Sequence, residues 1–201
     1  MTLVAEKIVV RQRGILEYLP ALLAMKEFTS RRTEKTEDEI WLLEHPPVYT
    51  LGQGADDATV ANGIPVVRSD RGGEITYHGP GQVVLYALID LARRGIKVKR
   101  FVWLLEQAVI DLLEGRGERR AGAPGVYVDG AKIAALGIRV SRGRSYHGLA
   151  LNVDMDLSPF SAIDPCGFPG LAVTDLKKSG FDFANAGPNL ASLLMKRIED
   201  A

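Results

Sequence analysis

The chain of 201 residues contains a single cysteine, Cys166. One thiol cannot form a disulfide within the chain, and this usage is typical of a protein in a reducing compartment. No apolar run approaches the roughly 20 residues that a membrane-spanning helix needs, and residues 1–7 lack the apolar core of a secretory signal. We therefore expect a cytoplasmic protein that does not enter a membrane.

The chain also lacks an excess of charge, because 25 Lys and Arg residues balance 25 Asp and Glu residues. This balance argues against a general nucleic-acid-binding protein, whose surface is normally basic. A local basic cluster of five residues is either a solvated face or a surface that attracts an acidic partner; its members are Arg93, Arg94, Lys97, Lys99 and Arg100. No linker rich in serine or proline divides the sequence, so we expect one domain over residues 1–201.

Paired metal-ligand motifs and phosphate-binding loops are missing as well. The single cysteine and the histidines His45, His78 and His147 show none of the spacings typical of a metal site. The glycine-rich segment matches neither the P-loop nor the dinucleotide-binding fingerprint. We therefore expect no metal and no cofactor.

That glycine-rich segment, residues 71–82, is the most informative part of the sequence. It combines four glycines with a histidine and an arginine, and an apolar run of strand length, residues 83–89, follows it. Glycine lets a backbone turn tightly and approach a ligand closely. The segment is either a binding loop beside a buried strand or a simple hairpin turn.

Cys166 lies in a second unusual segment, with two prolines and two glycines within four residues of it. This context is typical of a rigid, irregular loop, so Cys166 is a candidate nucleophile, although a lone cysteine is often an inert buried residue. A catalytic thiol needs a cation or base nearby. Lys132, among small residues, and His78 are the best candidates. The sequence alone nevertheless favours a solvated lysine just after a turn for Lys132, and a histidine such as His147 is more often a satisfied core residue.

Hydrophobic periodicity predicts an α+β domain in which strands outnumber helices. The pattern of residues 100–114 is the clearest helix, with Glu106, Gln107 and Asp111 facing outward. Turns at residues 129–130 and 142–143 predict successive hairpins. The expected strands are residues 7–11, 40–43, 48–51, 83–89, 126–128, 132–140 and 146–153, and the other expected helices are residues 16–35 and 189–199.

Several motifs together closely resemble those of the lipoyl(octanoyl) transferases. They are residues 45–50, 71–82, 123–128, Lys132, residues 145–153 and residues 165–167, and they occur in that order over most of the chain. The resemblance implies an octanoyltransferase catalytic domain that moves an octanoyl group from octanoyl-acyl carrier protein to a lysine of a lipoyl domain, the first step of endogenous lipoate synthesis. It also implies a fold similar to the catalytic domain of biotin- and lipoate-protein ligases, with a mixed, mostly antiparallel sheet and flanking helices around an acyl pocket.

The resemblance also implies roles for particular residues. Cys166 matches the nucleophile that carries the acyl group as a thioester, and Lys132 matches the lysine that lowers the pKa of its thiol. The implied acceptors are lipoyl domains of 2-oxoacid dehydrogenase complexes and the glycine cleavage H protein. The implied substrate-binding residues are Arg71, Gly72, Gly73, Glu74, Ile75, Thr76, Tyr77, His78, Ala135, Leu136, Gly137, Gly148, Leu149 and Ala150.

Two other function classes stay open at this point. An ATP-using lipoate or biotin ligase would share the fold and leave Cys166 without a chemical role, and a non-catalytic module could hold acylated domains. The motifs also leave open whether Lys132 or His78 carries the proton. An apolar pocket should select acyl chains by the methylenes it buries, so we expect both shorter and much longer chains to react more slowly than octanoyl.

Overall fold

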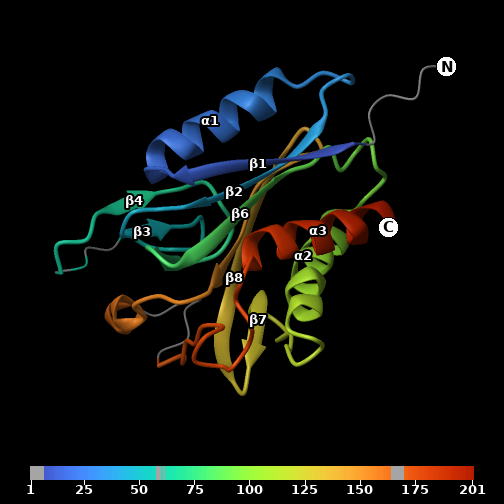
Figure 1. Ribbon diagram of the computed structural model, residues 1–201. Helices are drawn as coiled ribbons and strands as arrows, with labels where there is room; N and C mark the ends of the chain where they lie inside the picture. Colours follow the sequence, from blue (N-terminus) through green and yellow to red (C-terminus); the bar gives the residue numbers. More distant parts are fainter. Residues whose placement is uncertain (1–6, 58–59, 61, 164–169) are drawn as a thin grey trace.

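The computed structural model describes residues 7–57, 60, 62–163 and 170–201, which form an α+β fold with two sheets (Figure 1). The larger described sheet has the strand order β1-β2-β6-β9-β8-β7. β1 and β2 are parallel, whereas the other neighbouring strands of this sheet are antiparallel, which confirms the expected mixed, mostly antiparallel sheet. Its strands are β1 (Ile8–Ile15), β2 (Asp38–Glu44), β6 (Gln82–Leu88), β7 (Gly125–Val128), β8 (Ala131–Ser141) and β9 (Arg144–Asn152).

Two tight turns join the last three of these strands, as predicted. Asp129 and Gly130 connect β7 to β8 with φ values of 48° and 83°, and Arg142 and Gly143 connect β8 to β9 with values of 50° and 77°. Positive φ at both central residues gives a turn whose twist matches that of the flanking strands. These turns therefore set the register in which β8 lies between β7 and β9.

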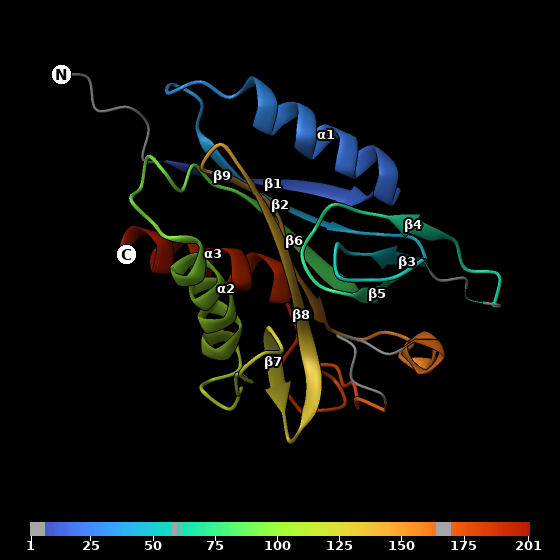
Figure 2. The ribbon, with the colours of Figure 1, turned by 180° about the vertical axis from the view of Figure 1, so that it is seen from behind.

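A smaller sheet has the order β4-β3-β5 and lies beside the larger one (Figure 2). Its strands are β3 (Val48–Leu51), β4 (Val66–Arg68) and β5 (Ile75–His78). β3 coincides with the predicted strand, because His45, Pro46 and Pro47 separate it from β2. β4, of three residues, and a 3-10 helix, η1 (Ser158–Ala162), are too short for periodicity to reveal, and neither was predicted.

The three described helices cover opposite faces of the larger sheet (Figures 1 and 2). α2 (Val98–Leu112) and α3 (Ala186–Glu199) lie on one face, and α1 (Tyr18–Arg31) lies on the other. Each corresponds to a predicted helix with shifted ends. None of the helices in the described part of the chain is both long and apolar enough to span a membrane.

Side chains alternate between these two faces along each strand of the sheet. On β6, Leu85 and Ala87 belong to the core packed on α2 and α3, whereas Val84 and Tyr86 belong to the core beneath α1. The small sheet and α1 share this second face. The pocket described below lies on this face, between the larger sheet and β5 with its preceding loop.

The prediction that Glu106 faces outward was wrong. Its side chain is buried, and it accepts hydrogen bonds from the backbone N–H of Gly125 at 3.1 Å and from Arg119 at 3.0 Å. A carboxylate that bonds to a neighbouring segment can occupy a buried helix position that an apolar residue would otherwise fill. The spacing of apolar residues along the helix does not reveal a buried carboxylate whose partners lie in another segment.

Candidate active site

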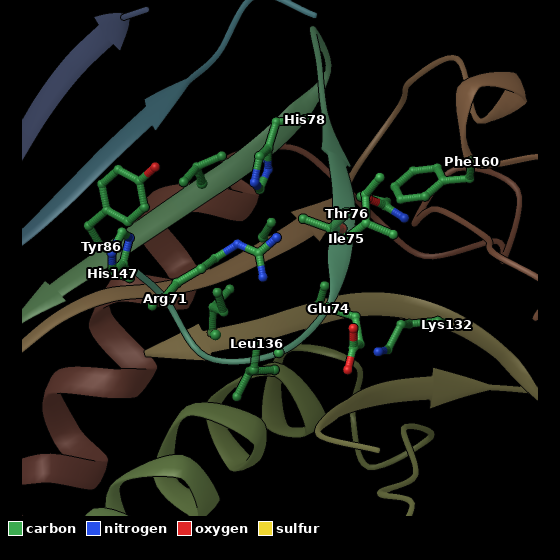
Figure 3. A pocket seen from close by; sticks show the side chains of 18 of the residues that line it. Arg71, Glu74, Ile75, Thr76, His78, Tyr86, Lys132, Leu136, His147 and Phe160 are labelled. Atoms are coloured by element: carbon green, nitrogen blue, oxygen red, sulfur yellow. The ribbon is translucent and has the colours of Figure 1, made fainter. Parts of the chain in front are cut away.

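A pocket opens on the second face of the larger sheet, between β6, β8 and β9 on one side and β5 with its preceding loop on the other (Figure 3). Twelve of the fourteen predicted substrate-binding residues line it, and the buried side chain of Lys132 does so as well. The twelve are Arg71, Gly73, Glu74, Ile75, Thr76, His78, Ala135, Leu136, Gly137, Gly148, Leu149 and Ala150. The structure therefore brings together segments that are far apart in the sequence.

Two predicted binding residues do not line the pocket. Gly72 donates its backbone N–H to the carbonyl of Ile138 at 3.0 Å, which ties the loop to β8. The ring of Tyr77 packs on Tyr49 and Phe160 in a separate small core. Both residues position the pocket wall rather than form its surface.

The loop before β5 closely approaches both β8 and the residue after β3, because each of them presents a glycine to it. A Cβ atom on Gly137 would lie 2.7 Å from the carbonyl oxygen of Gly72, and a Cβ on Gly52 would lie 2.0 Å from that of Gly73. The buried Arg71 side chain holds the same loop by donating to the carbonyl and hydroxyl oxygens of Thr50 at 2.6 and 2.8 Å. Arg71 thus helps to fix the shape of the pocket.

Lys132 reaches the pocket because β8 is irregular at this point. Lys132 pairs with Tyr127, but Ala134 pairs with Val126, so Ile133 is an extra residue in the β7–β8 ladder. Ile133 and Ala134 both belong to the core beneath α2 and α3. A bulge of this kind turns the next side chain to the other face of the sheet, and here it directs Lys132 into the pocket.

The surroundings of the Lys132 side chain are also adapted to it. Its Nζ lies 5.4 Å from the ring centroid of Tyr127. Gly125 leaves room for it, because a Cβ on Gly125 would lie 2.6 Å from the Lys132 Cε. A residue larger than glycine at position 125 would therefore clash with the Lys132 side chain.

The chain segment after residue 169 returns directly to Lys132. The backbone N–H of Lys132 donates to Ala172 at 2.8 Å, and that of Thr174 donates to Lys132 at 3.0 Å. Phe160 and Val173, on either side of residues 164–169, both line the pocket. Cys166 itself lies outside the described residues.

The other end of the pocket holds a group of aromatic and histidine side chains. The register places this end level with Tyr86, because Gly137 pairs with Gly148 and Gly148 pairs with Tyr86. Figure 3 shows Tyr86 and His147 on the opposite side of the pocket from Lys132. All three histidines of the chain take part in this group.

The hydrogen bonds of His45 determine its tautomer. Its Nδ1 lies 2.5 Å from the carbonyl oxygen of Leu16, which can only accept, so Nδ1 carries the proton. Its Nε2 then accepts the hydroxyl proton of Tyr86 at 2.6 Å. Burial lowers the pKa of His45 and raises that of Tyr86, so both groups are neutral at pH 7.

His78 is equally constrained. Its Nδ1 donates to the Gln82 side-chain oxygen at 2.8 Å, and its Nε2 lies 3.4 Å from the Thr50 hydroxyl. Burial, with the nearby His45 ring, lowers the pKa of His78 to about 3. A group with that pKa is a neutral imidazole and a weak base at pH 7.

His147 has an unusual backbone conformation within β9. Its φ is 59°, the left-handed region, and its ring stacks on Tyr146 at 5.0 Å. In a regular strand His147 would share the face of Leu149, which packs in the core beneath α2 and α3. The left-handed residue instead lies with Tyr146 and Tyr86 on the pocket face.

Asp70 holds the His147 ring in place. The His147 Nε2 donates to Asp70 at 2.9 Å, and the same carboxylate accepts from Tyr146 at 2.6 Å and from Lys26 at 3.1 Å. Burial opposes ionisation of Asp70, but these hydrogen bonds hold its pKa below its usual range. Burial lowers the pKa of His147, although the bond to Asp70 acts in the opposite direction.

Seven further residues that line the pocket were not among the predicted binding residues. Alternation along residues 83–89 could have indicated Val84 and Tyr86, since both share a face, but no local signal shows which face meets the ligand. The seven are Tyr18, Val84, Tyr86, His147, Asn152, Phe160 and Val173. In the described part of the chain, no group of three or more His, Cys, Asp or Glu residues could hold a metal ion.

Two members of the predicted basic cluster, Arg93 and Arg94, lie far from Lys132. Arg93 and Arg94 bind the buried Asp38 at 2.7 and 2.6 Å, and Arg32 binds the same carboxylate. They lie beside Arg144 at the end of β8 that is distant from Lys132. That separation is roughly 30 Å at the usual strand rise, so we do not expect a substrate protein bound near Lys132 to contact these two arginines.

Comparison with known proteins gives consistent results. Residues 17–185 match the family model described as the lipoyl protein ligase A/B catalytic domain. An octanoyltransferase of Aromatoleum aromaticum is 59% identical over 95% of this chain and 86% of its own length. An octanoyltransferase of Thiobacillus denitrificans is 60% identical over 88% of this chain and 84% of its own length.

Solved structures show the same fold at much lower identity. A crystal structure of lipoate-protein ligase A bound with ATP has a TM-score of 0.69 at 16% identity and covers 98% of this chain and 85% of its own. The biotin protein ligase from Aquifex aeolicus, in complex with biotin and ATP, has a TM-score of 0.54 at 12% identity, covering 97% and 69%. These likenesses confirm the predicted fold.

Proposed function

This chain belongs to the lipoyl protein ligase A/B catalytic domain family, and on that premise we propose that it transfers octanoyl from octanoyl-acyl carrier protein to a lysine of a lipoyl domain through a thioester on Cys166. It is an acyltransferase, like its octanoyltransferase relatives. The proposal concerns the donor, the acceptor and the covalent intermediate.

One observation carries the proposal: a pocket with apolar walls holds a buried lysine at one end. Between its ends the walls include Ile75, Val84 and Ala150, which suit the methylenes of an acyl chain. Lys132 lies where the segments flanking residues 164–169 meet the pocket. This arrangement supports a reacting carbonyl near Lys132 and an acyl chain that extends away from it.

The first step would transfer the acyl group to the enzyme. The Cys166 thiolate attacks the thioester carbonyl carbon, the new carbon–sulfur bond forms, and the bond to the carrier sulfur breaks. The carrier thiolate takes up a proton from the Lys132 ammonium and leaves as a thiol, so that Lys132 is neutral before the second step. A positive charge on Lys132 favours the Cys166 thiolate, which is the attacking species.

The second step would transfer the group to the acceptor. The neutral amine of the target lysine attacks the acyl-enzyme, an amide bond forms, and Cys166 leaves as a thiolate. The attacking nitrogen must lose a proton. We assign its transfer to Lys132 rather than His78, because the pKa of His78 is about 3 and its Nδ1–H is bonded to Gln82.

The acceptors we propose are lipoyl domains of 2-oxoacid dehydrogenase complexes and the glycine cleavage H protein. Their target lysine would approach at the Lys132 end, because the opposite end is closed by buried side chains such as Tyr86 and His147. The donor carrier would use the same end in the first step. The two protein substrates therefore cannot occupy the site together.

Intact mass spectrometry after incubation with octanoyl-acyl carrier protein tests this function directly. We expect one octanoyl adduct on the parent protein, loss of the adduct after a lipoyl domain is added, and no adduct on Cys166→Ala. An exposed-residue control, Lys178→Met, should acylate like the parent, since Lys178 lies on the surface.

Two results would contradict the proposal. An adduct that persists in Cys166→Ala would show that another group carries the acyl chain. Octanoylation of the lipoyl domain that requires ATP and free octanoate would instead indicate the chemistry of an adenylate-forming ligase.

A further inference from the structure

The pocket end opposite Lys132 is closed by two polar side chains, Tyr86 and His147, which we call the polar wall. Along β8, Lys132 and the position level with Tyr86 are five residues apart, which is roughly 16 Å at the usual strand rise. The walls between these ends are mainly apolar. An acyl chain with its carbonyl at Lys132 therefore points its methyl end at the polar wall.

Tyr86 cannot move away without leaving a buried polar group unpaired. Its hydroxyl donates to His45 Nε2, and the His45 Nδ1–H is already bonded to Leu16. Tyr86 and His45 are both buried, so water cannot replace the broken bond at low cost. Tyr86 thus forms a fixed part of the wall.

His147 is held just as firmly, from a different side. Its ring stacks on Tyr146 and meets the edge of Tyr86, with centroid distances of 5.0 and 6.0 Å. Its Nε2–H bonds to Asp70 at 2.9 Å. Its buried Nδ1 has no hydrogen-bond partner among the described residues, and the stacked, bonded ring forms a second fixed part of the wall.

We propose that the polar wall sets the longest acyl chain that this enzyme transfers efficiently, with His147 as the main specificity-determining residue. The inference rests on the proposed octanoyl transfer. Each methylene added within the apolar part of the pocket stabilises binding by its burial. A methylene that reaches the wall must displace hydrogen-bonded side chains. The accepted length therefore ends where the wall begins.

The test compares kcat/KM for carrier thioesters of eight, ten and twelve carbons. His147→Gly removes the ring without strain, because glycine readily adopts the φ of 59° found at this position. We expect the twelve-to-eight-carbon ratio to rise roughly tenfold or more in this variant. His147→Asn, which is smaller and tolerates the same φ, should move the ratio in the same direction.

Tyr146→Phe is the matched control. It removes one hydrogen bond to the same Asp70, but Tyr146 does not line the pocket, so the ratio should stay at the parent value. A general loss of stability lowers all rates together and leaves the ratio unchanged.

The outcomes are distinguishable. An unchanged ratio in both His147 variants, with octanoyl transfer retained, overturns the proposal. Equal rates for all three donors in the parent protein overturn it without any variant. Absence of transfer from every donor in the parent overturns the proposed function itself.

Discussion

Lys132 and His147 both reach the pocket through a local departure from regular strand geometry. An extra residue in the β7–β8 ladder turns Lys132 onto the pocket face, and a left-handed φ of 59° does the same for His147. Conformations of this kind are seldom kept without a reason and are common at functional sites. Each polar end of the pocket thus depends on an irregular backbone conformation at one position in a strand.

Substitution of Lys132 should change the ionisation of the Cys166 thiol. Without a nearby ammonium, Lys132→Met should alkylate more slowly at pH 7, and the midpoint of its rate against pH should rise toward about 8.5, the value of a free thiol. Iodoacetamide reaction rates measured across pH give this midpoint. Lys178→Met, at an exposed lysine, serves as the control and should match the parent. If Lys132→Met keeps the parent midpoint, another group activates the thiol.

Residue identities alone revealed only part of the site. Residues 71–78 and Lys132 could be recognised because their motifs are local in sequence. Tyr18, Tyr86 and Asn152 could not, because their place at the pocket depends on the register of β6 and β9 and on the position of α1. The core-histidine interpretation of His147 is half right: the ring is buried and bonded to Asp70, but it also lines the pocket.

At the scale of elements, the contact between β8 and the loop before β5 determines the pocket. Gly137→Ala would place a Cβ 2.7 Å from the Gly72 carbonyl and 3.3 Å from the Arg71 side chain, so the loop must shift. We expect a loss of about 1–3 kcal/mol in the free energy of unfolding, as for other overpacked sites, and a higher KM for the octanoyl donor. Urea unfolding and steady-state kinetics measure both effects.

A second glycine provides the control for this prediction. A Cβ on Gly187, in α3, would make only ordinary contacts, with its nearest atom at 3.5 Å. Gly187→Ala should therefore leave KM unchanged and unfold no more easily than the parent. If Gly137→Ala behaves in the same way, the close approach of loop and strand is not needed for binding.

The elements themselves could largely be predicted. The turn residues at 129–130 and 142–143 predicted the hairpins. The apolar stripe along residues 100–114 predicted α2. Both signals are local in the sequence. β4 and η1 were missed because three to five residues carry too little periodicity. Glu106 was misplaced because its buried partners, Arg119 and Gly125, lie on other elements.

At the scale of the whole molecule, the buried histidine group joins most parts of the fold. His45 follows β2, His78 ends β5 and His147 lies in β9, while Tyr18 and Tyr86 add α1 and β6. Both sheets and one helix therefore meet at side chains that must stay neutral to remain buried. The stability of the entire fold is thereby linked to the protonation of these rings.

This linkage predicts that the protein loses stability in mild acid. Burial lowers the pKa of His45, His78 and His147 in the folded protein, that of His78 to about 3, whereas each is about 6.5 in the unfolded chain. Below pH 6.5 the unfolded chain therefore binds protons that the folded protein does not. The free energy of unfolding must fall with pH, by up to about 1.4 kcal/mol per pH unit for each histidine.

Urea unfolding at pH 7, 6 and 5 measures this slope in a range where carboxylates such as Asp70, whose pKa is lowered, stay ionised. His147→Asn removes one of the titrating groups and keeps a residue that tolerates a φ of 59°. Its stability should depend less steeply on pH than that of the parent, whatever its stability at pH 7. Parallel curves for the two proteins would mean that His147 takes up its proton in the folded state at its ordinary pKa, and that the buried ring is not held neutral by its surroundings.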